Sequence, residues 1–280
     1  MKCAWQEYLN LLPHWMRQEV DRQGRLGLQE LRLRMGQPPQ LQFQNKCLCL
    51  NRRTEREDLL FVINTASKFS PWTAETVREG FITACGGHRV GICGQATVNQ
   101  GRMTGISAVS SVCIRVARDF SDIAPRVADV TGSTLIIGPP GSGKTTLLRD
   151  LVRQISDAEQ GSVSVVDERQ EIFPVFQGQA CFDRGKNSDI ISGCTKSDGI
   201  NAVLRSMNPR WIAVDEITAQ ADAEALLYAG WCGVTLLATA HAGSLADLKS
   251  RPVYRPLIAN KLFQNVLVLR RDKSWTMERM

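Results

Sequence analysis

A glycine-rich stretch between residues 138 and 146 carries the residue types that bind phosphate. It reads GPPGSGKTT and matches the pattern G-x-x-x-x-G-K-[ST] at every fixed position. Glycines let backbone N–H groups curl around a phosphate, the lysine reaches outer phosphate oxygens, and the next hydroxyl is a ligand for Mg²⁺. An apolar run precedes the stretch and a helical pattern follows it, which argues against a chance glycine turn. We predict that a nucleoside triphosphate and Mg²⁺ bind here through Gly138, Pro139, Pro140, Gly141, Ser142, Gly143, Lys144, Thr145 and Thr146.

A second group of candidate residues follows the apolar run WIAV at residues 211–214. Asp215 and Glu216 come directly after it. We expect Asp215 to hold the Mg²⁺ shell through water and Glu216 to orient or deprotonate the attacking water. The alternative interpretation is that this acidic pair only stabilises the start of the next helix.

Two further strand ends carry polar side chains. The run VSVV at 163–166 is followed by Asp167, Glu168 and Glu171, and VTLLATA ends at His241. Carboxyl ends of parallel strands converge on one edge, so these residues should face the same ligand as the glycine loop. We expect the three acidic residues to position water or to support the metal. The alternative is that they are only solvent-exposed residues where the strand ends. We expect His241 to contact the γ-phosphate and couple its loss to movement, with an ordinary structural histidine as the alternative.

These side chains require a parallel sheet wrapped by helices to position them. The predicted strands lie at 134–138, 163–166, 211–214 and 234–239, and the predicted helices at 145–155, 198–207 and 219–230. A final β pair closes the domain. We therefore predict an α/β fold, a RecA-like P-loop NTPase core at 125–280, preceded by a smaller α+β domain at 1–124.

The N-terminal region alternates short strand-like and helix-like stretches. Residues 40–50 read as a hairpin, and Thr54 with Glu57 has the form of a capping box opening a helix toward Lys68. A second helix is predicted from about residue 73 to 85. Two β-rich runs then flank a turn at 99–101.

Composition excludes several classes of protein. The chain has 280 residues, of which 43% are hydrophobic, and this content excludes a wholly disordered chain. Its net charge of +6 excludes a large electrostatic field of a single sign. Residues 1–130 hold 17 basic against 12 acidic residues, and 14 of the 17 are Arg.

Nine cysteines without a C-x-x-C pair, and three histidines, indicate buried thiols of a cytosolic protein rather than a zinc site. The uncharged segment 225–246 contains glycines that favour helix, turn and strand over a membrane span.

Four motifs together resemble the type II and type IV secretion and pilus ATPase superfamily. GPPGSGKTTLLRD, VVDERQEI, RSMNPRWIAVDEI and TLLATAHA look like its Walker A, Asp box, Walker B and His box, in the same order. GGHRVGICG and CIRVAR narrow the resemblance to a sporulation branch. It implies that Lys144 and Thr145 bind nucleotide and Mg²⁺ and that Glu216 is the catalytic glutamate. Many members have Gly where this chain has Asp215, so mechanisms of those members transfer less directly.

The resemblance also implies partners. Members form hexameric rings in which N-terminal arginines reach a neighbour's phosphate, so Arg89 and Arg115 are candidates for this role, with ordinary strand-face charges as the alternative. The expected function is an ATP-hydrolysing motor, cytoplasmic and peripheral to the membrane through a partner, that powers or assembles a membrane-embedded channel between mother cell and forespore. Two alternatives remain: a nucleic-acid-dependent ATPase and a nucleotide-gated scaffold. No nucleic acid is expected, because recognition motifs and aromatic-interleaved basic stretches are absent from the sequence.

Overall fold

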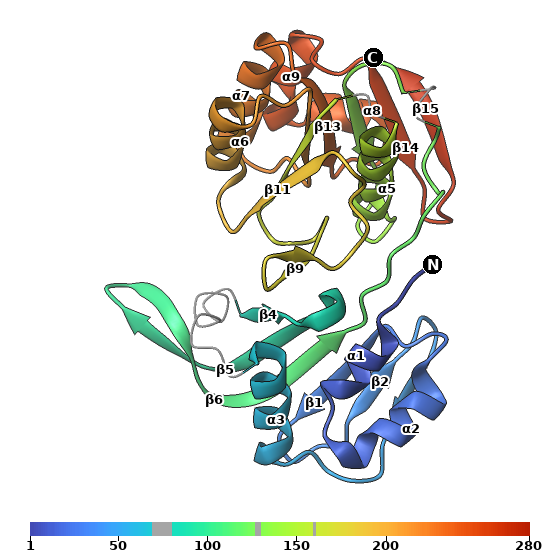
Figure 1. Ribbon diagram of the computed structural model, residues 1–280, viewed down its shortest axis with the longest axis vertical. Coiled ribbons are helices and arrows are strands. Elements are labelled where there is room, and N and C mark those ends of the chain that lie inside the picture. The colour runs from blue at the N-terminus through green and yellow to red at the C-terminus, as the bar shows by residue number, and fades with distance from the viewer. Residues whose placement is uncertain (69–79, 127–129, 159–160) are drawn as a thin grey trace. The chain divides into compact units, whose positions relative to one another are not determined.

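The chain folds into two compact units, seen in a computed structural model that describes residues 1–68, 80–126, 130–158 and 161–280 (Figure 1). The first unit comprises Met1–Asp119 with Pro174–Phe182, and the second comprises Phe120–Phe173 with Asp183–Met280. The chain first passes between the units at residues 119 and 120, near the predicted boundary at 124 and 125. The segment 174–182 lies within the predicted second domain, yet it packs in the first unit.

The first unit is an antiparallel sheet with helices packed on it. The strand order is β3-β2-β1-β6-β5-β4, and every pairing in it is antiparallel. Apolar side chains on one face of β1, β5 and β6 meet those of three helices in a single core. The elements are α1 (Trp5–Asn10), α2 (His14–Gly24), β1 (Glu30–Arg34), β2 (Gln40–Gln42), β3 (Cys47–Cys49), α3 (Arg56–Ser67), β4 (Phe81–Thr83), β5 (Arg89–Asn99), β6 (Arg102–Arg115), β9 (Val175–Phe176) and β10 (Gln179–Ala180).

Local patterns explain most of these elements. The predicted hairpin is formed by β2 and β3, and the predicted turn at 99–101 joins β5 to β6 with Gln100 and Gly101 at positive φ. The capping box of α3 uses Glu55 and Asp58, one residue later than the pair predicted from sequence. The helix predicted at 73–85 is wrong at its described end, where residues 81–83 form β4 because they pair with β5. Residues 73–79 lie outside the described residues.

The second unit is a mostly parallel seven-stranded sheet. Its strand order is β11-β8-β12-β13-β7-β14-β15, with only β15 antiparallel. The elements are β7 (Thr134–Ile137), α5 (Lys144–Asp157), β8 (Val163–Asp167), β11 (Ser188–Ser192), α6 (Lys196–Ser206), β12 (Trp211–Val214), α7 (Gln220–Trp231), β13 (Thr235–Ala240), α8 (Leu245–Ser250), α9 (Arg255–Ala259), β14 (Asn265–Leu269) and β15 (Trp275–Arg279). The predicted strands, helices and closing β pair are therefore confirmed within a few residues.

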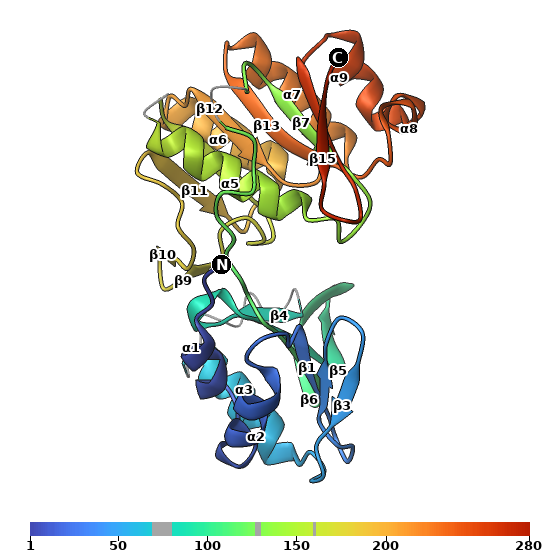
Figure 2. The same ribbon diagram turned by 90° about the vertical axis from the view of Figure 1, so that its right-hand side faces the viewer.

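Helices cover both faces of this sheet. Figure 2 shows α5 on one face, with α6 and α7 behind the strands. Residues of β7, β8, β12 and β13 are almost wholly buried, because each face of these strands packs against helices. The carboxyl ends of these four strands lie along one edge, where the candidate residues are found.

Two expectations concern features outside the site. All nine cysteines are free thiols, but each is exposed or only partly buried, so the expectation of buried core thiols is wrong. Among the described residues, no helix has the length and apolar character needed to cross a membrane.

Candidate functional site

The glycine loop between β7 and α5 has the geometry of a phosphate cradle. Gly141 and Gly143 have φ values of 71° and 102°, which residues with a Cβ rarely adopt. At Gly138, a Cβ would lie 2.6 Å from the Leu269 carbonyl oxygen, so only glycine fits there. Among the described residues, no side chain caps the N-terminus of α5. The first N–H groups of α5 and the positive end of its dipole are therefore available to an anion.

Lys144 is held inside this loop. Its Nζ donates to the carbonyl oxygens of Gly138 and Pro139 at 3.1 and 3.2 Å and lies 3.1 Å from Nδ1 of His241. The residue is buried, and burial lowers the pKa of its ammonium. The nearby hydroxyl of Ser142 is buried and has no hydrogen-bond partner among the described residues. An arriving phosphate would supply acceptors for both side chains.

Asp215 stands at the end of β12 and is buried, with two hydroxyl donors. Thr145 Oγ1 donates to Asp215 Oδ2 at 2.8 Å, and Thr239 Oγ1 donates to Oδ1. Burial raises the pKa of Asp215, and these two hydrogen bonds act in the opposite direction. The predicted Mg²⁺ residues Thr145 and Asp215 are thus brought into direct contact.

Glu216 and His241 meet across the ends of β12 and β13. Oε1 of Glu216 lies 2.6 Å from Nε2 of His241. Because a lysine ammonium can only donate, Nδ1 of His241 accepts from Lys144, and Nε2 carries the proton that Glu216 accepts. Glu216 has a φ of 48°, in the left-handed region.

Together these contacts form a closed circuit around the phosphate cradle. Lys144 contacts His241, and His241 contacts Glu216. The hydroxyl of Thr239 binds both Glu216 and Asp215. Asp215 in turn accepts a hydrogen bond from Thr145, the residue after Lys144. Sequence reasoning missed Thr239. The signal was available in the sequence, where VTLLATAH reads as one strand and Thr239 precedes His241 by two positions, so that both are expected on the same face.

Asp167 is the last residue of β8, and its side chain accepts hydrogen bonds from backbone N–H groups. Its carboxylate accepts hydrogen bonds from the N–H groups of Glu171, Ile172 and Phe173 at 2.8, 2.9 and 2.8 Å. Burial raises its pKa to about 6, although these hydrogen bonds favour the ionised form. Asp167 therefore shapes the loop that carries Glu171.

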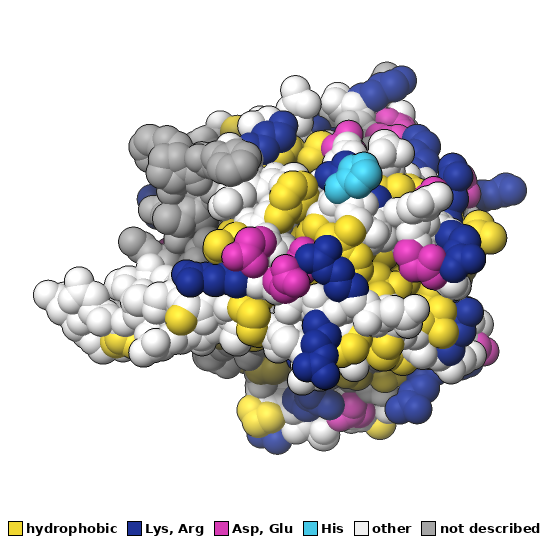
Figure 3. Space-filling model, turned by 90° about the horizontal axis from the view of Figure 1, so that it is seen from below, with side chains coloured by type: hydrophobic (Ala, Val, Ile, Leu, Met, Phe, Trp, Pro, Cys, Tyr) yellow, Lys and Arg dark blue, Asp and Glu magenta, His cyan; other side chains and the backbone are white. Residues whose placement is uncertain are grey.

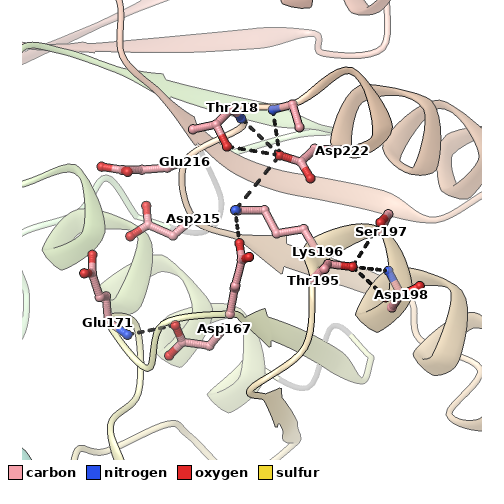
Figure 4. Close-up of polar contacts among 12 residues, drawn as sticks. Asp167, Glu171, Thr195, Lys196, Ser197, Asp198, Asp215, Glu216, Thr218 and Asp222 are labelled. Atoms are coloured by element: carbon pink, nitrogen blue, oxygen red, sulfur yellow. Dashed lines mark hydrogen bonds and ion pairs between the residues drawn. The ribbon is translucent and has the colours of Figure 1, made fainter. Parts of the chain in front are cut away.

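Glu168 and Glu171 line a small pocket together with Asp167, Asp215 and Glu216. Lys196, at the start of α6, also lines it; the lysine forms an ion pair with Glu168 and lies 4.0 Å from Asp222. Figure 4 shows Lys196 reaching from α6 toward the carboxylates at the ends of the strands. Sequence reasoning missed Lys196, because its distance in the chain from the acidic residues gives no local signal. The pocket thus contains a buried cation beside the acidic residues.

Arg89 and Arg115 belong to the first unit. They are directly paired residues on β5 and β6. The Arg89 guanidinium lies 3.7 Å from the centre of the Phe81 ring, and the exposed Arg115 lies 3.8 Å from Glu30. The structure therefore brings the two predicted arginines together, in the unit that does not contain the glycine loop.

A larger pocket of about 550 Å³ opens beside the glycine loop within the second unit. Its lining includes Phe120, Ile123, Gly143 and Thr146. Asp150 of α5 accepts hydrogen bonds from the N–H groups of residues 122–124, which holds this wall against the helix. The pocket combines apolar walls with direct access to the start of α5.

The donor set suits Mg²⁺ accompanied by a nucleotide. The described residues contain no cluster of three or more His, Cys, Asp or Glu side chains arranged as a metal site. Mg²⁺ instead binds through few protein oxygens, completed by water and substrate phosphates. One hydroxyl, on Thr145, and one carboxylate, on Asp215, lie where the cradle would present phosphate oxygens. The residues present therefore fit the ion that the sequence predicts.

Comparisons with known proteins identify the family of this chain. Residues 5–277 match the family described as "Sporulation stage III, protein AA". Stage III sporulation protein AA of Bacillus subtilis (strain 168) is 34% identical over 95% of this chain and 91% of its own length.

Two solved structures share the fold. The Legionella pneumophila ATPase DotB aligns with a TM-score of 0.59 and 17% identity, over 96% of this chain and 80% of its own. The pilus retraction motor PilT with bound ADP aligns with a TM-score of 0.61 and 17% identity, over 89% and 76%. The second unit thus has the RecA-like fold of secretion ATPases, and the chain belongs to the sporulation stage III protein AA family.

Proposed function

We propose that this protein is a Mg²⁺-dependent ATPase of the secretion-motor type. The observation that carries the proposal is the circuit of contacts joining Lys144, His241, Glu216, Asp215 and Thr145 around the glycine loop. An isolated phosphate-binding loop needs only the lysine and the hydroxyl. The circuit adds the carboxylate of Glu216, which is suited to act on water. It also adds His241, which contacts both Lys144 and Glu216.

The chemistry is hydrolysis of the terminal phosphoanhydride bond. Water attacks the γ-phosphorus, a new P–O bond forms, the bond to the β-phosphate oxygen breaks, and ADP and phosphate leave. Glu216 orients the water and accepts its proton. Lys144 and the N–H groups at the start of α5 stabilise the charge on the phosphate oxygens. Mg²⁺, held at Thr145 and Asp215, would supply further charge neutralisation.

Nucleotide binding exchanges partners within the circuit. In the structure, Lys144 donates to two loop carbonyls and to Nδ1 of His241. A γ-phosphate offers Lys144 a charged acceptor, and the Nε2 proton of His241, which Glu216 accepts in the structure, would be donated to that phosphate instead. Loss of phosphate then returns His241 to Lys144 and Glu216. His241 thereby distinguishes the two states, as expected for the start of a relay to movement.

The pocket beside the loop is suited to the nucleoside. Phe120 and Ile123 offer an apolar surface to a base, next to the helix N-terminus that takes the phosphates. These side chains have no group that would tell adenine from guanine, so the choice of ATP rests on family membership.

The proposal extends to assembly and location. The chain acts as a homo-oligomer, a hexameric ring in which Arg89 or Arg115 of one subunit reaches the phosphate of a neighbour. It is cytoplasmic, attaches to the membrane through a membrane-embedded partner, and powers or assembles a sporulation channel between mother cell and forespore. The support is membership of the sporulation family and the shared fold with a pilus motor and DotB.

Two measurements test the motor. ATP turnover is measured with Mg²⁺ present and removed, and the mass in solution is measured with and without a non-hydrolysable ATP analogue. We expect Mg²⁺-dependent turnover and a ring-sized mass with the analogue. Tight ATP binding without turnover in an assembled ring would instead support the nucleotide-gated scaffold.

Stimulation of turnover by single-stranded DNA, lost as salt rises, would instead support the nucleic-acid motor. On the face drawn in Figure 3, Lys and Arg side chains lie among acidic and hydrophobic ones. Arg22 with Glu19 and Arg52 with Glu55 are ion pairs of the first unit. Such local pairing leaves fewer unpaired cations for phosphates than the arginine excess alone indicates.

A further inference from the structure

Thr239 occupies a central position in the site. It lies near the end of β13 and is completely buried. β12 and β13 pair in parallel with Val214 opposite Ala238, so Thr239 stands beside Asp215 as both strands end. A hydroxyl at this point is close to both carboxylate-bearing residues of the neighbouring strand.

One hydroxyl group serves both residues. Thr239 Oγ1 donates its proton to Oδ1 of Asp215 and accepts the N–H of Glu216 at 2.8 Å. The carbonyl oxygen of Thr239 accepts the N–H of Ile217 at 3.0 Å. Thr239 therefore anchors three consecutive residues at the end of β12.

The backbone at Glu216 needs such an anchor. Its φ of 48° is uncommon for a residue with a Cβ, and this conformation persists where surrounding contacts impose it. The conformation turns the chain after Asp215 so that the Glu216 side chain meets His241. Without a partner for its N–H, Glu216 would lose the contact that holds this turn.

We propose that Thr239 is a positioning residue that uses a single hydroxyl to set both Asp215 and Glu216 for the reaction. The part of this inference that concerns turnover rests on the proposed ATPase function. The hydroxyl of Thr239 binds the Asp215 carboxylate and the Glu216 backbone N–H, so Thr239 acts through these two residues.

Three substitutions separate the hydroxyl from the shape of the side chain. Thr239→Val keeps the branched shape and removes the donor and acceptor, whereas Thr239→Ser keeps the hydroxyl. Thr235→Val makes the same chemical change four residues earlier in β13, at its first residue. Each variant is first checked for folding by thermal unfolding.

Exchange of the Glu216 amide hydrogen is the readout that does not depend on activity. Measured by NMR on the full nucleotide-free chain, this exchange should be at least about tenfold faster in Thr239→Val than in the unmodified chain. It should be unchanged in Thr239→Ser and Thr235→Val. Equal protection in Thr239→Val would overturn the inference, whether or not the chain hydrolyses ATP.

Turnover provides the second readout. In Thr239→Val we expect kcat to fall about 100-fold with a KM change below about threefold, because the groups are misplaced while the phosphate cradle is intact. Thr239→Ser should recover most of the rate. In a Glu216→Gln background, Thr239→Val should cost far less than it costs alone, because two residues that act together are not additive.

The possible failures are distinguishable. If Glu216→Gln leaves turnover intact, the proposed function of Glu216 fails, while the amide exchange still decides whether Thr239 holds the turn. If Glu216→Gln abolishes turnover but Thr239→Val retains the normal rate, only the inference about Thr239 is overturned. A loss in Thr239→Ser equal to that in Thr239→Val would also overturn it, because the hydroxyl would then not be the active feature.

Discussion

Nε2 of His241 lies 2.6 Å from Oε1 of Glu216, so the histidine at the end of β13 directly contacts the carboxylate at the end of β12. The same imidazole contacts Lys144 through its other nitrogen. His241 therefore joins the residue expected to act on water to the residue expected to hold the phosphate. A neutral imidazole is required for this arrangement, because one nitrogen accepts while the other donates.

Removing the imidazole should separate binding from turnover. In His241→Ala we expect ATP affinity to change by less than about threefold and kcat to fall at least about tenfold, because a positioned donor to the phosphate is lost. Titration with a fluorescent ATP analogue and steady-state phosphate release measure the two quantities. His14→Ala, at an exposed histidine of the first unit, is the matched control. Full turnover in His241→Ala would contradict the assigned role.

Lys144→Ala should abolish useful nucleotide binding. Its ammonium donates to two carbonyl oxygens of the glycine loop. Losing a charge-assisted contact to phosphate should weaken affinity by about 100-fold, or ~3 kcal/mol. Isothermal titration with ATP and Mg²⁺ measures this loss. Lys249→Ala, at an exposed lysine of α8, should bind normally. Unchanged affinity in Lys144→Ala would place the phosphates elsewhere.

The raised pKa of Asp167 predicts an unusual pH dependence of the free energy of unfolding. Its pKa is raised from 3.8 to about 6 in the folded chain, mainly by burial. Between these values the folded state binds more protons than the unfolded state, so this residue's contribution to the free energy of unfolding falls as pH rises. The full fall is roughly 3 kcal/mol at most.

Urea denaturation of the unmodified chain and of Asp167→Asn from pH 4 to pH 7 tests this dependence. The stability advantage of the unmodified chain over Asp167→Asn should shrink as pH rises through this window. A difference that stays constant with pH would show that Asp167 titrates normally.

Mixing two inactive variants tests whether an arginine acts between subunits. Lys144→Ala is expected to bind nucleotide about 100-fold more weakly, whereas Arg89→Ala and Arg115→Ala are expected to keep normal binding. If either arginine completes a neighbour's site, Lys144→Ala subunits would supply the arginine to a partner that binds ATP. Turnover should then rise in the mixture above the sum of the separate samples. No gain in an assembled mixture would contradict action between subunits for that arginine.

The parts of the site that could be predicted from the sequence are those with local patterns. The glycine loop, the strand ending at Asp215 and Glu216, and the strand ending at His241 are contiguous runs whose periodicity places them at one edge of a parallel sheet. The contact between Thr145 and Asp215 follows from that topology. Family resemblance added the arginines and the expected ring.

The remaining features depend on tertiary structure. Lys196 reaches Glu168 from a helix start 28 residues later, and nothing near Lys196 in the sequence indicates an acidic partner. Residues 81–83 are Phe, Ile and Thr, which are common in strands, and they pair with β5; the helix predicted from about residue 73 to 85 extends too far across them. Residues 174–182 follow directly from the loop that Asp167 holds, yet pack in the first unit. Local patterns carry no information about such long-range packing.

Turnover by Glu216→Gln tests the central claim most directly. Glutamine keeps the size and the hydrogen-bonding reach of the side chain but cannot accept the water proton, so the variant should bind Mg·ATP normally and release phosphate about 100-fold or more slowly. Glu224→Gln makes the same change at an exposed position of α7 and should leave the rate intact. Phosphate release is measured on purified, assembled protein with bound nucleotide quantified in parallel. Normal binding with turnover lost is the predicted result, and steady turnover at the unmodified rate by Glu216→Gln would contradict the account.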